Sequence, residues 1–594
     1  MSRVLSAAAL ALLLSAPLLS APLPALAKTG EETGDASEKP VDTQSLAGSY
    51  LAARVALTDR DTSNAVRHYR RALALDPTNV KLRQDAFLTL ITNGDFAEAI
   101  EIGKTLPKDA APGVVRLATA VDRLRAKDTA GAVKELDRNW TGALDRLISG
   151  LVLAWAQQGT GDTDLALDTI DGLRGPAWFD LFVSYHGGLI ALAADRNEDA
   201  VKRLTRAVGS DALRGTPKSA PQIVEALAIA HARLGQFDEA LEAVEKETVR
   251  QPGPLTDRLN MRLREKAVPA FPITSAQRGA AEVLRNIGSA IGRQGGYQFA
   301  GIYFQLANAL APKMDTVALA LAEYYDQSGA LERANAAFEA IPETSPYRRI
   351  ARLEKALNLD ELEKLDEARA ALDKLLAEDP DDLVTTLSYG AVLARHEKFG
   401  DAAEIYEKAL ARIDDPQAIH WSLFYRQGIA YERTKRWPLA EAAFKKALEL
   451  FPNEPRVLNY LGYSWVDMNM NLEEGLEMIE TAVSLRPRDG YIVDSLGWAL
   501  YRMGRYEDAV RELERAVELR PADPTINDHL GDALWRAGRK LEAVYQWNHA
   551  LALDPEADQE QIIRDKVRNG LAPDIKDVAQ PTAEPKDEAA DDKS

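Results

Sequence analysis

The sequence contains no cysteine among its 594 residues. This absence excludes disulfide bonds, thiolate metal sites and cysteine nucleophiles. It is compatible with an oxidising compartment, where a free thiol is a hazard. We also expect no N-terminal lipid anchor of the kind that is attached to a cysteine.

Positive charge and catalytic motifs are scarce as well. Lys and Arg number 72 against 91 Asp and Glu, which gives a net charge of −19 and argues against nucleic acid or anionic membrane surfaces as partners. The metalloprotease motif H-E-x-x-H, the phosphate loop G-x-x-x-x-G-K and the nucleophile motif G-x-S-x-G do not occur. His529 and His549 have no third histidine or cysteine near them in sequence. We therefore expect no catalytic residue, no metal site and no cofactor.

Long apolar runs are missing after the first residues. A short basic region and an apolar stretch ending near Leu19 precede Ala25-Leu26-Ala27, which has the A-x-A pattern of a signal-peptide cleavage site. Two prolines interrupt this stretch, whereas a membrane anchor needs roughly 20 apolar residues without such breaks. We predict a cleaved signal peptide at residues 1–27, Lys28 as the first mature residue, and a periplasmic protein without a transmembrane segment. An uncleaved anchor is the alternative.

One small residue recurs along the chain at a nearly fixed interval. A large apolar residue follows it four positions later, and most gaps between neighbouring copies are 34 residues. A period of this length is typical of stacked helical repeats. The fourteen anchors are Ala65, Ala99, Ala132, Ala166, Ala200, Ala240, Ala300, Ala334, Ala368, Ala402, Ala440, Gly475, Ala509 and Ala543.

The complete repeat is clearest near the C-terminus, where it contains Phe424, Gly428, Tyr431, Ala440, Phe444, Ala447 and Pro452. This pattern resembles the tetratricopeptide-repeat family, from about Ser45 to Glu560. The resemblance implies an all-α superhelical solenoid of about 14 helix-turn-helix repeats, each an antiparallel pair of a helix A and a helix B. A second small residue twelve positions before most anchors, such as Gly428, allows the two helices to approach closely.

Breaks in the pattern set the expected domains. A Pro-rich insertion lies within the 60-residue gap between Ala240 and Ala300; we interpret it as a loop with one added helix near 257–266, with a partner-docking loop as the alternative. The segment 209–221 is a shorter insertion. The expected domains are a signal peptide (1–27), a disordered acidic linker (28–45), an N-terminal arm (46–250), the insertion (251–276), a C-terminal arm (277–560), a capping helix (561–572) and a disordered acidic tail (573–594).

Family resemblance places the partner-binding face on helix A, at positions 2, 5, 9 and 12 of each repeat. In the C-terminal arm, aromatic and charged residues gather at or beside these positions, namely Tyr463, Tyr491, Asp494, Trp498, Tyr501, Arg502, Asp532, Trp535 and Arg536. Because Trp, Tyr and Arg are enriched at binding hot spots, we predict that these residues contact a protein or an extended peptide. The alternative is that a helix with Ile562, Ile563 and Val567 covers Trp498 and Trp535. The equivalent N-terminal positions, such as Phe182 and Tyr185, are apolar and indicate either self-packing or a second partner surface.

The chain also resembles a group of large proteobacterial envelope repeat proteins. Some members of that group are outer-membrane lipoproteins that deliver substrates to a carboxyl-terminal processing protease, and this chain departs from them in lacking the lipidated cysteine. We therefore interpret it as a non-enzymatic periplasmic scaffold or adaptor, with a protease as one partner that the resemblance implies. The alternative is a structural subunit of an envelope polysaccharide or secretion assembly.

Overall fold

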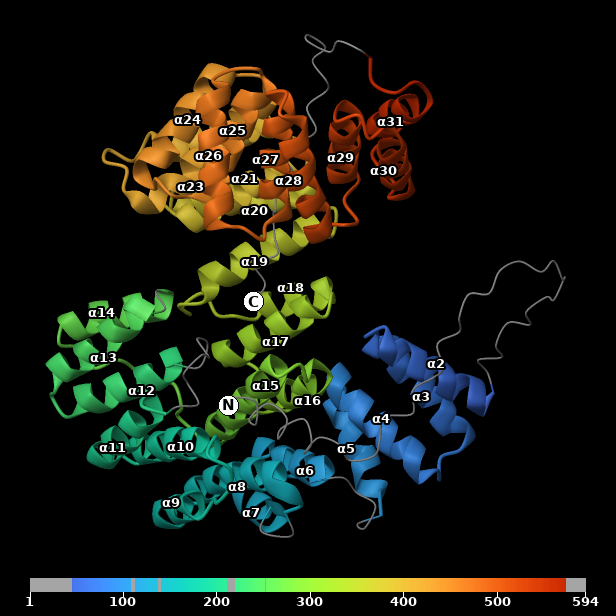
Figure 1. Ribbon diagram of the computed structural model, residues 1–594. Coiled ribbons are helices and arrows are strands. Elements are labelled where there is room, and N and C mark those ends of the chain that lie inside the picture. Colours follow the sequence, from blue (N-terminus) through green and yellow to red (C-terminus); the bar gives the residue numbers. More distant parts are fainter. Residues whose placement is uncertain (1–44, 108–112, 137–139, 211–219, 251–252, 573–594) are drawn as a thin grey trace. The chain divides into compact units, whose positions relative to one another are not determined.

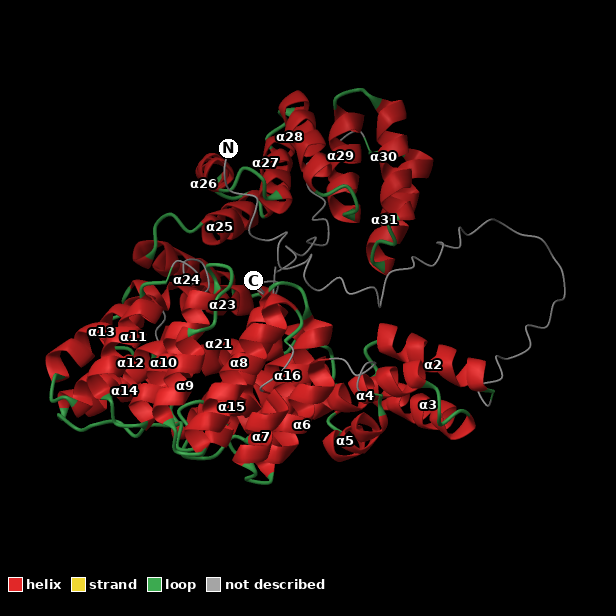
Figure 2. Ribbon diagram, turned by 90° about the horizontal axis from the view of Figure 1, so that it is seen from below, coloured by secondary structure: helices red, strands yellow, loops and turns green. Residues whose placement is uncertain are grey.

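The computed structural model describes residues 45–107, 113–136, 140–210, 220–250 and 253–572. Within these ranges the chain forms α-helices joined by short turns, and no strand occurs among them (Figure 2). None of the described helices combines the length and the apolar character that crossing a membrane requires. The predicted all-α class is thus confirmed, whereas the signal peptide, the tail and nearly all of the acidic linker lie outside the described residues.

The chain divides into two compact units, Met1–Lys364 and Leu365–Ser594. The helices of unit 1 are α2 (Leu46–Thr58), α3 (Thr62–Leu75), α4 (Val80–Asn93), α5 (Phe96–Thr105), α6 (Gly113–Arg125), α7 (Thr129–Leu136), α8 (Gly142–Gly159), α9 (Thr163–Asp171), α10 (Phe179–Ala193), α11 (Asn197–Val208), α12 (Ala220–Arg233), α13 (Phe237–Arg250), α14 (Pro254–Arg264), α15 (Ala276–Arg293), α16 (Tyr297–Leu310), α17 (Asp315–Gln327), α18 (Leu331–Glu339) and α19 (Arg348–Glu361) (Figure 1).

Unit 2 continues the same alternation of helices. Its elements are α20 (Leu365–Glu378), α21 (Leu383–Arg395), α22 (Phe399–Leu410), the 3-10 helix η3 (Ala418–His420), α23 (Trp421–Arg433), α24 (Trp437–Leu450), α25 (Pro455–Asp467), α26 (Leu472–Leu485), α27 (Gly490–Arg502), α28 (Tyr506–Leu519), α29 (Pro524–Arg536), α30 (Lys540–Ala552) and α31 (Ala557–Asn569) (Figure 1). Each helix A of α23–α30 packs on the helix B that follows it.

The predicted repeat register is confirmed by burial. Each of the fourteen anchors lies in the second helix of a pair, and every one of them is buried. The small residues of helix A face the same contact: a Cβ added at Gly428 would come within 2.5 Å of Phe444, and one at Gly531 within 2.3 Å of Trp547. These distances show that helix A rests directly on a large side chain of helix B, so any larger residue at the glycine would separate the two helices.

Unit 1 departs from a solenoid in which each repeat contacts only its neighbours. Helix α15 packs on α8 and α10, and α16 packs on α4, α5 and α6, so helices far apart in sequence lie side by side (Figure 1). At the centre of this contact Gly279 of α15 lies against the indole of Trp155 of α8, where an added Cβ would come within 2.1 Å of the ring. Trp155 is fully buried. The apolar N-terminal helix-A positions therefore serve self-packing, as one of the two interpretations proposed.

This packing affects the expected division into arms. Residues on both sides of the insertion, from Val66 to Val317, share one hydrophobic core, and the compact units separate between Lys364 and Leu365, away from residues 251–276. The insertion contains the added helix, α14, whose Leu255 and Leu259 are buried. The structure therefore joins to one unit the segments that the sequence pattern assigns to two arms, because α15 and α16 fold back onto α4–α10.

Candidate functional site

The predicted binding residues of the C-terminal arm come from the first helices of three successive repeats, α25, α27 and α29. We call the surface that they form the helix-A face, and define it by Asn459, Tyr463, Asp494, Trp498, Tyr501, Asp528, Asp532 and Trp535. Asp494 and Asp528 are 34 residues apart, as are Trp498 and Asp532, and Tyr501 and Trp535. Identical positions in stacked repeats place the side chains of each pair one repeat apart.

Capping residues fix where these helices begin. The carboxylate of Asp489 accepts hydrogen bonds from the backbone N–H groups of Tyr491 and Ile492, and Asp523 does the same for Thr525 and Ile526 at 2.9 and 3.1 Å. An aspartate in this position satisfies N–H groups that have no partner within the helix. The side chains of α27 and α29 are thereby held in the same rotational register.

At the centre of the helix-A face, Trp498 is sandwiched between two other rings. Its indole stacks on Tyr501 with centroids 4.9 Å apart and on His529 at 4.2 Å. His529 Nδ1 lies 2.9 Å from a carboxylate oxygen of Asp494, and Asp494 and His529 are both buried. Burial lowers the pKa of His529, but Asp494 raises it by more, so the net shift is upward. This pair therefore favours a protonated imidazole.

A second buried group joins α29 to α31. Lys566 Nζ of α31 lies 2.7 Å from Asp528 Oδ2 and 2.9 Å from Asp532 Oδ2. The other oxygen of Asp532 accepts a hydrogen bond of 3.0 Å from Trp547 Nε1. Burial raises the pKa of Asp532 to about 6, against the opposing charge of Lys566. Burial lowers the pKa of Lys566, but the two carboxylates raise it above its usual range.

Helix α31 thus covers the last part of the helix-A face. Besides Lys566, it contributes Ile563, which is 1% exposed, and the backbone of Gly570 directly after the helix lies against the indole of Trp535. Trp535 also contacts Trp547, with ring centroids 5.4 Å apart. The predicted capping helix is therefore present and covers Trp535.

The remaining predicted residues lie toward α25 and at the helix ends. Arg502 pairs with Asp467 at 3.3 Å, and the guanidinium of Arg520 lies 4.7 Å from the ring centroid of Tyr491. Tyr463 is partly buried, and burial raises its pKa well above the usual range. Arg536 is also partly buried. All nine predicted residues belong to one unit, and the charged ones among them neighbour groups of opposite sign or aromatic rings.

Two expectations change with this geometry. Trp498 was expected to lack a packing role in its own unit, but it is only 4% exposed and lies between Tyr501 and His529, so it stabilises the contact between α27 and α29. Its contact with a partner stays a prediction. The sequence interpretation missed Lys566 as a functional neighbour, although its spacing of three residues from Ile563 places both on one side of α31.

Other expected packing residues agree with the structure. Trp465 and Trp547 are fully buried, as predicted for the core positions of the repeat, and Trp437 is partly buried. In the described ranges, no group of three or more His, Asp or Glu is arranged to hold a metal ion.

Comparison with known proteins agrees with the repeat register. Sequence profiles of the tetratricopeptide repeat match residues 56–127, 185–254, 353–419, 390–455, 425–467 and 495–558. A TPR repeat-containing protein of Pseudomonas aeruginosa is 32% identical over 90 residues, which span 15% of this chain and 15% of that protein.

Solved repeat structures align over long stretches with low TM-scores. The crystal structure of the APC/C hetero-tetramer Cut9-Hcn1 is 15% identical and covers 88% of this chain and 96% of the solved chain, with a TM-score of 0.36. Yeast Tom70 is 15% identical and covers 88% and 95%, with a TM-score of 0.32. The TPR protein YrrB is 19% identical and covers 33% and 98%, with a TM-score of 0.27.

Profile matches, anchor burial and helix pairing agree on one architecture. Such repeats form scaffolds for protein–protein interaction, and the fold is typically non-catalytic. The chain is a member of the tetratricopeptide-repeat family.

Proposed function

We propose that this chain is a periplasmic adaptor that holds a partner protein or an extended peptide on the helix-A face of unit 2. The observation that supports it is the docking of α31. This helix of the same chain lies on the α29 part of the face, inserts the ammonium of Lys566 between two carboxylates and covers Trp535. The face therefore has the chemistry to accept a peptide segment with a basic side chain.

The part of the face on α25 and α27 offers related groups. Arg456 at the start of α25 is exposed, with 44% of its side chain accessible, and Tyr463, Tyr491 and Arg502 are partly exposed. Aromatic side chains supply apolar area to an interface, while charged side chains orient the partner and exclude partners of the wrong charge. Stacked helices lose little conformational entropy on binding, which favours affinity.

The cellular role within this proposal is to bring substrates to an envelope protease. It follows from the resemblance to envelope repeat proteins that partner a carboxyl-terminal processing protease. The periplasmic address rests on the A-x-A pattern at Ala25-Leu26-Ala27, and the absence of cysteine separates this chain from the lipid-anchored members of that group.

Site-specific photocrosslinking in cells tests the proposal. A benzophenone amino acid replaces Arg456 or Tyr491 on the helix-A face, and Tyr545 serves as the matched control because it is 68% exposed on helix B of the last repeat. We expect adducts at Arg456 and Tyr491 but not at Tyr545, with a protease or its substrates among the captured chains.

Two results would contradict the proposal. Adducts at Tyr545 alone would place the partner on the opposite side of the repeats. Capture of synthase or pore subunits at all three positions would instead favour the structural role in an envelope assembly. Edman sequencing of the purified protein tests the address separately, since a first residue other than Lys28 would remove the support for the predicted cleavage site.

A further inference from the structure

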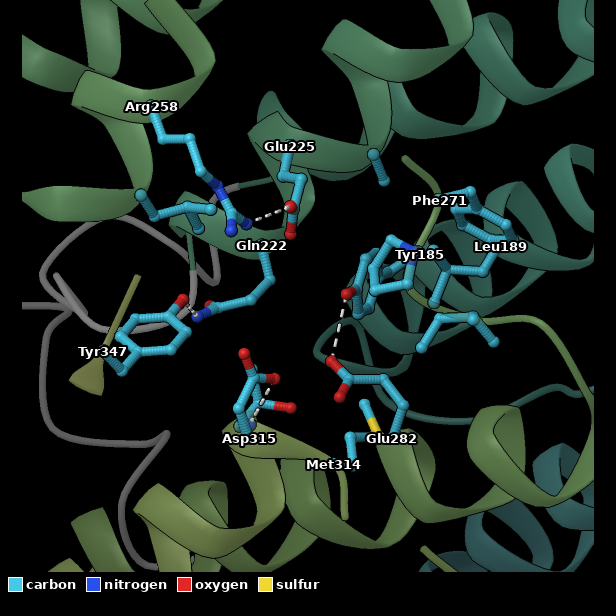
Figure 3. A pocket seen from close by; sticks show the side chains of 15 residues that line it. Tyr185, Leu189, Gln222, Glu225, Arg258, Phe271, Glu282, Met314, Asp315 and Tyr347 are labelled. Carbon is cyan, nitrogen blue, oxygen red and sulfur yellow. Dashed lines mark hydrogen bonds and ion pairs between the residues drawn. The ribbon is translucent and has the colours of Figure 1, made fainter. Parts of the chain in front are cut away.

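A cavity of about 50 Å³ lies inside unit 1, between α10, α12, α14, α15 and the start of α17 (Figure 3). Leu189, Phe271 and Met314 form part of an apolar wall. Gln222, Glu225 and Asp315 line the cavity with polar groups, and Figure 3 shows their side chains pointing into it. The cavity is far in sequence from the helix-A face of unit 2 and does not depend on the function proposed for that face.

Glu225 is the poorly compensated charge in this cavity. The residue is 9% exposed, and its nearest ion-pair partner, Arg258, is 4.0 Å away, too far for a hydrogen bond. No hydrogen bond to its carboxylate occurs within the described part of the chain. Burying a carboxylate without close partners is costly, so a ligand that supplies the missing charge would be stabilised here.

The other two carboxylates of the cavity already have partners. Glu282 accepts a hydrogen bond of 3.0 Å from Tyr185 Oη and lies 2.6 Å from Arg285 Nη2. Asp315 accepts hydrogen bonds from Ser345 Oγ at 2.7 Å and from the backbone N–H of Thr316 at 2.9 Å. These contacts leave Glu225 as the carboxylate whose hydrogen-bonding capacity is unused.

Two further acceptors in the wall lack partners. Gln222 donates its amide N–H to Tyr347 Oη at 3.1 Å, which leaves its Oε1 buried without a hydrogen bond, and Thr316 Oγ1 is buried and unpartnered as well. A buried polar atom without a partner is rare in a folded protein and points to a missing water or ligand. Together with Glu225, the cavity therefore offers three unused oxygen acceptors.

We propose that this cavity binds a primary alkylammonium group. Such a group carries one positive charge and three N–H donors, which match the carboxylate and the two neutral oxygens, while its alkyl stem fits the apolar wall. A volume of 50 Å³ accommodates about three to five groups of the size of water, which is the ammonium and the last carbons of a chain. The group can come from a lysine side chain, a peptide N-terminus or a small diamine.

The protonation of Glu225 makes this binding pH-dependent. Burial raises the pKa of Glu225 to about 7, the charge of Arg258 opposes this, and two neighbouring carboxylates add to it. Because only the ionised carboxylate attracts a cation, the affinity should fall about tenfold from pH 8 to pH 6, in line with the ionised fraction. The titratable groups that line the cavity with Glu225 are Tyr185, Arg258, Glu282, Asp315 and Tyr347.

Isothermal titration calorimetry on the full mature chain tests the proposal. The probe is n-butylammonium, and n-butanol is the neutral control of the same shape. We expect binding of the ammonium at pH 8 and at least tenfold weaker binding of the alcohol. Acetyl-lysine amide, triglycine amide and 1,4-diaminobutane then distinguish a side chain, a peptide N-terminus and a diamine as the natural source.

Variants assign the binding to Glu225. The change Glu225→Gln should weaken n-butylammonium binding at least tenfold and remove its pH dependence, while Glu242→Gln, at an exposed position on the next helix, should change neither. Because Glu225→Gln removes a buried charge, the melting temperature should hold or rise. Should that variant fail to fold, the pH profile of the wild-type chain decides.

Three results would overturn the proposal: equal affinity for the alcohol and the ammonium, binding that is the same at pH 6 and pH 8, or a Kd weaker than about 10 mM. The last of these would mean that the cavity holds only water.

Discussion

Replacing Lys566 by Met should release α31 from the helix-A face. In the folded chain the ammonium lies within 3 Å of both Asp528 and Asp532, and the side chains of Lys566 and Asp532 are 5% and 0% exposed. Removing one partner of a buried ion pair costs about 3–5 kcal/mol, because the remaining charge stays buried without compensation. Methionine keeps most of the volume, so lost packing adds little to this cost.

The cost has a defined pH dependence. The pKa of Asp532 in the folded chain, about 6, lies above the unfolded value of about 3.9. An acid whose pKa is raised by folding lowers the stability as pH rises from about 4 through 6. Without Lys566 the pKa of Asp532 rises further, so the deficit of the variant should be largest near pH 7.5 and smaller at pH 5.

Hydrogen exchange measured by mass spectrometry is the suitable assay, with a thermal melt beside it. Amides of α31 should exchange faster by a factor of about 100 or more, since 1.4 kcal/mol corresponds to tenfold. The control is Arg564→Met on the same helix, whose side chain is 49% exposed and pairs with Glu560; an exposed pair is worth about 1 kcal/mol or less.

A triple change offers a second check on the cause. Asp528→Asn and Asp532→Asn combined with Lys566→Met remove all three charges, and this should restore most of the protection, because replacing a whole buried ion cluster is often neutral. Unchanged exchange in Lys566→Met, or a triple variant no better than the single one, would refute the electrostatic explanation of α31 docking.

Three other substitutions test the packing. Ala509→Leu should cost about 1–3 kcal/mol by overpacking the anchor site, and an unchanged melting temperature would mean that the repeat register is wrong. Gly279→Ala should also lower the melting temperature, because its Cβ would meet the Trp155 ring at 2.1 Å, whereas Gly400→Ala, which meets nothing within 4 Å, should leave it unchanged or higher. Trp498→Ala should cost about 3–5 kcal/mol, and circular dichroism melts that show no loss would return this indole to the list of free binding residues.

The repeat could be predicted from sequence because it depends on local spacing. An alanine anchor such as Ala509 and a glycine such as Gly497 twelve positions earlier specify where two helices touch, and Gly497 indeed faces Leu513 of the following helix. This information lies within 34 residues, so the helical period and the small residues suffice to reveal it. The added helix α14 and the cap α31 were found from the same local signals.

The closure of unit 1 was not predictable in this way. The contact of Gly279 with Trp155 joins residues more than 120 positions apart, and nothing in the repeat period specifies which distant helix will meet α15. The burial of Trp498 failed for a related reason: repeat position describes packing inside a pair, while His529, which covers the indole, belongs to the next pair. The acceptors Gln222 and Thr316 likewise meet Glu225 only through the folding of separate helices.

The two units therefore use one repeat code with different outcomes for helix A. In unit 1, Tyr185 on helix α10 is 5% exposed and bonds to Glu282 of α15, so this part of the helix-A surface is occupied by the unit itself. In unit 2, the described helix that docks on the equivalent surface is α31, and its contacts fall on α29. A scaffold binds partners through surface that its own fold has not consumed. This difference favours α25 and α27 as the place where a partner protein contacts the chain, and it leaves unit 1 with a small enclosed site whose chemistry suits a single ammonium group.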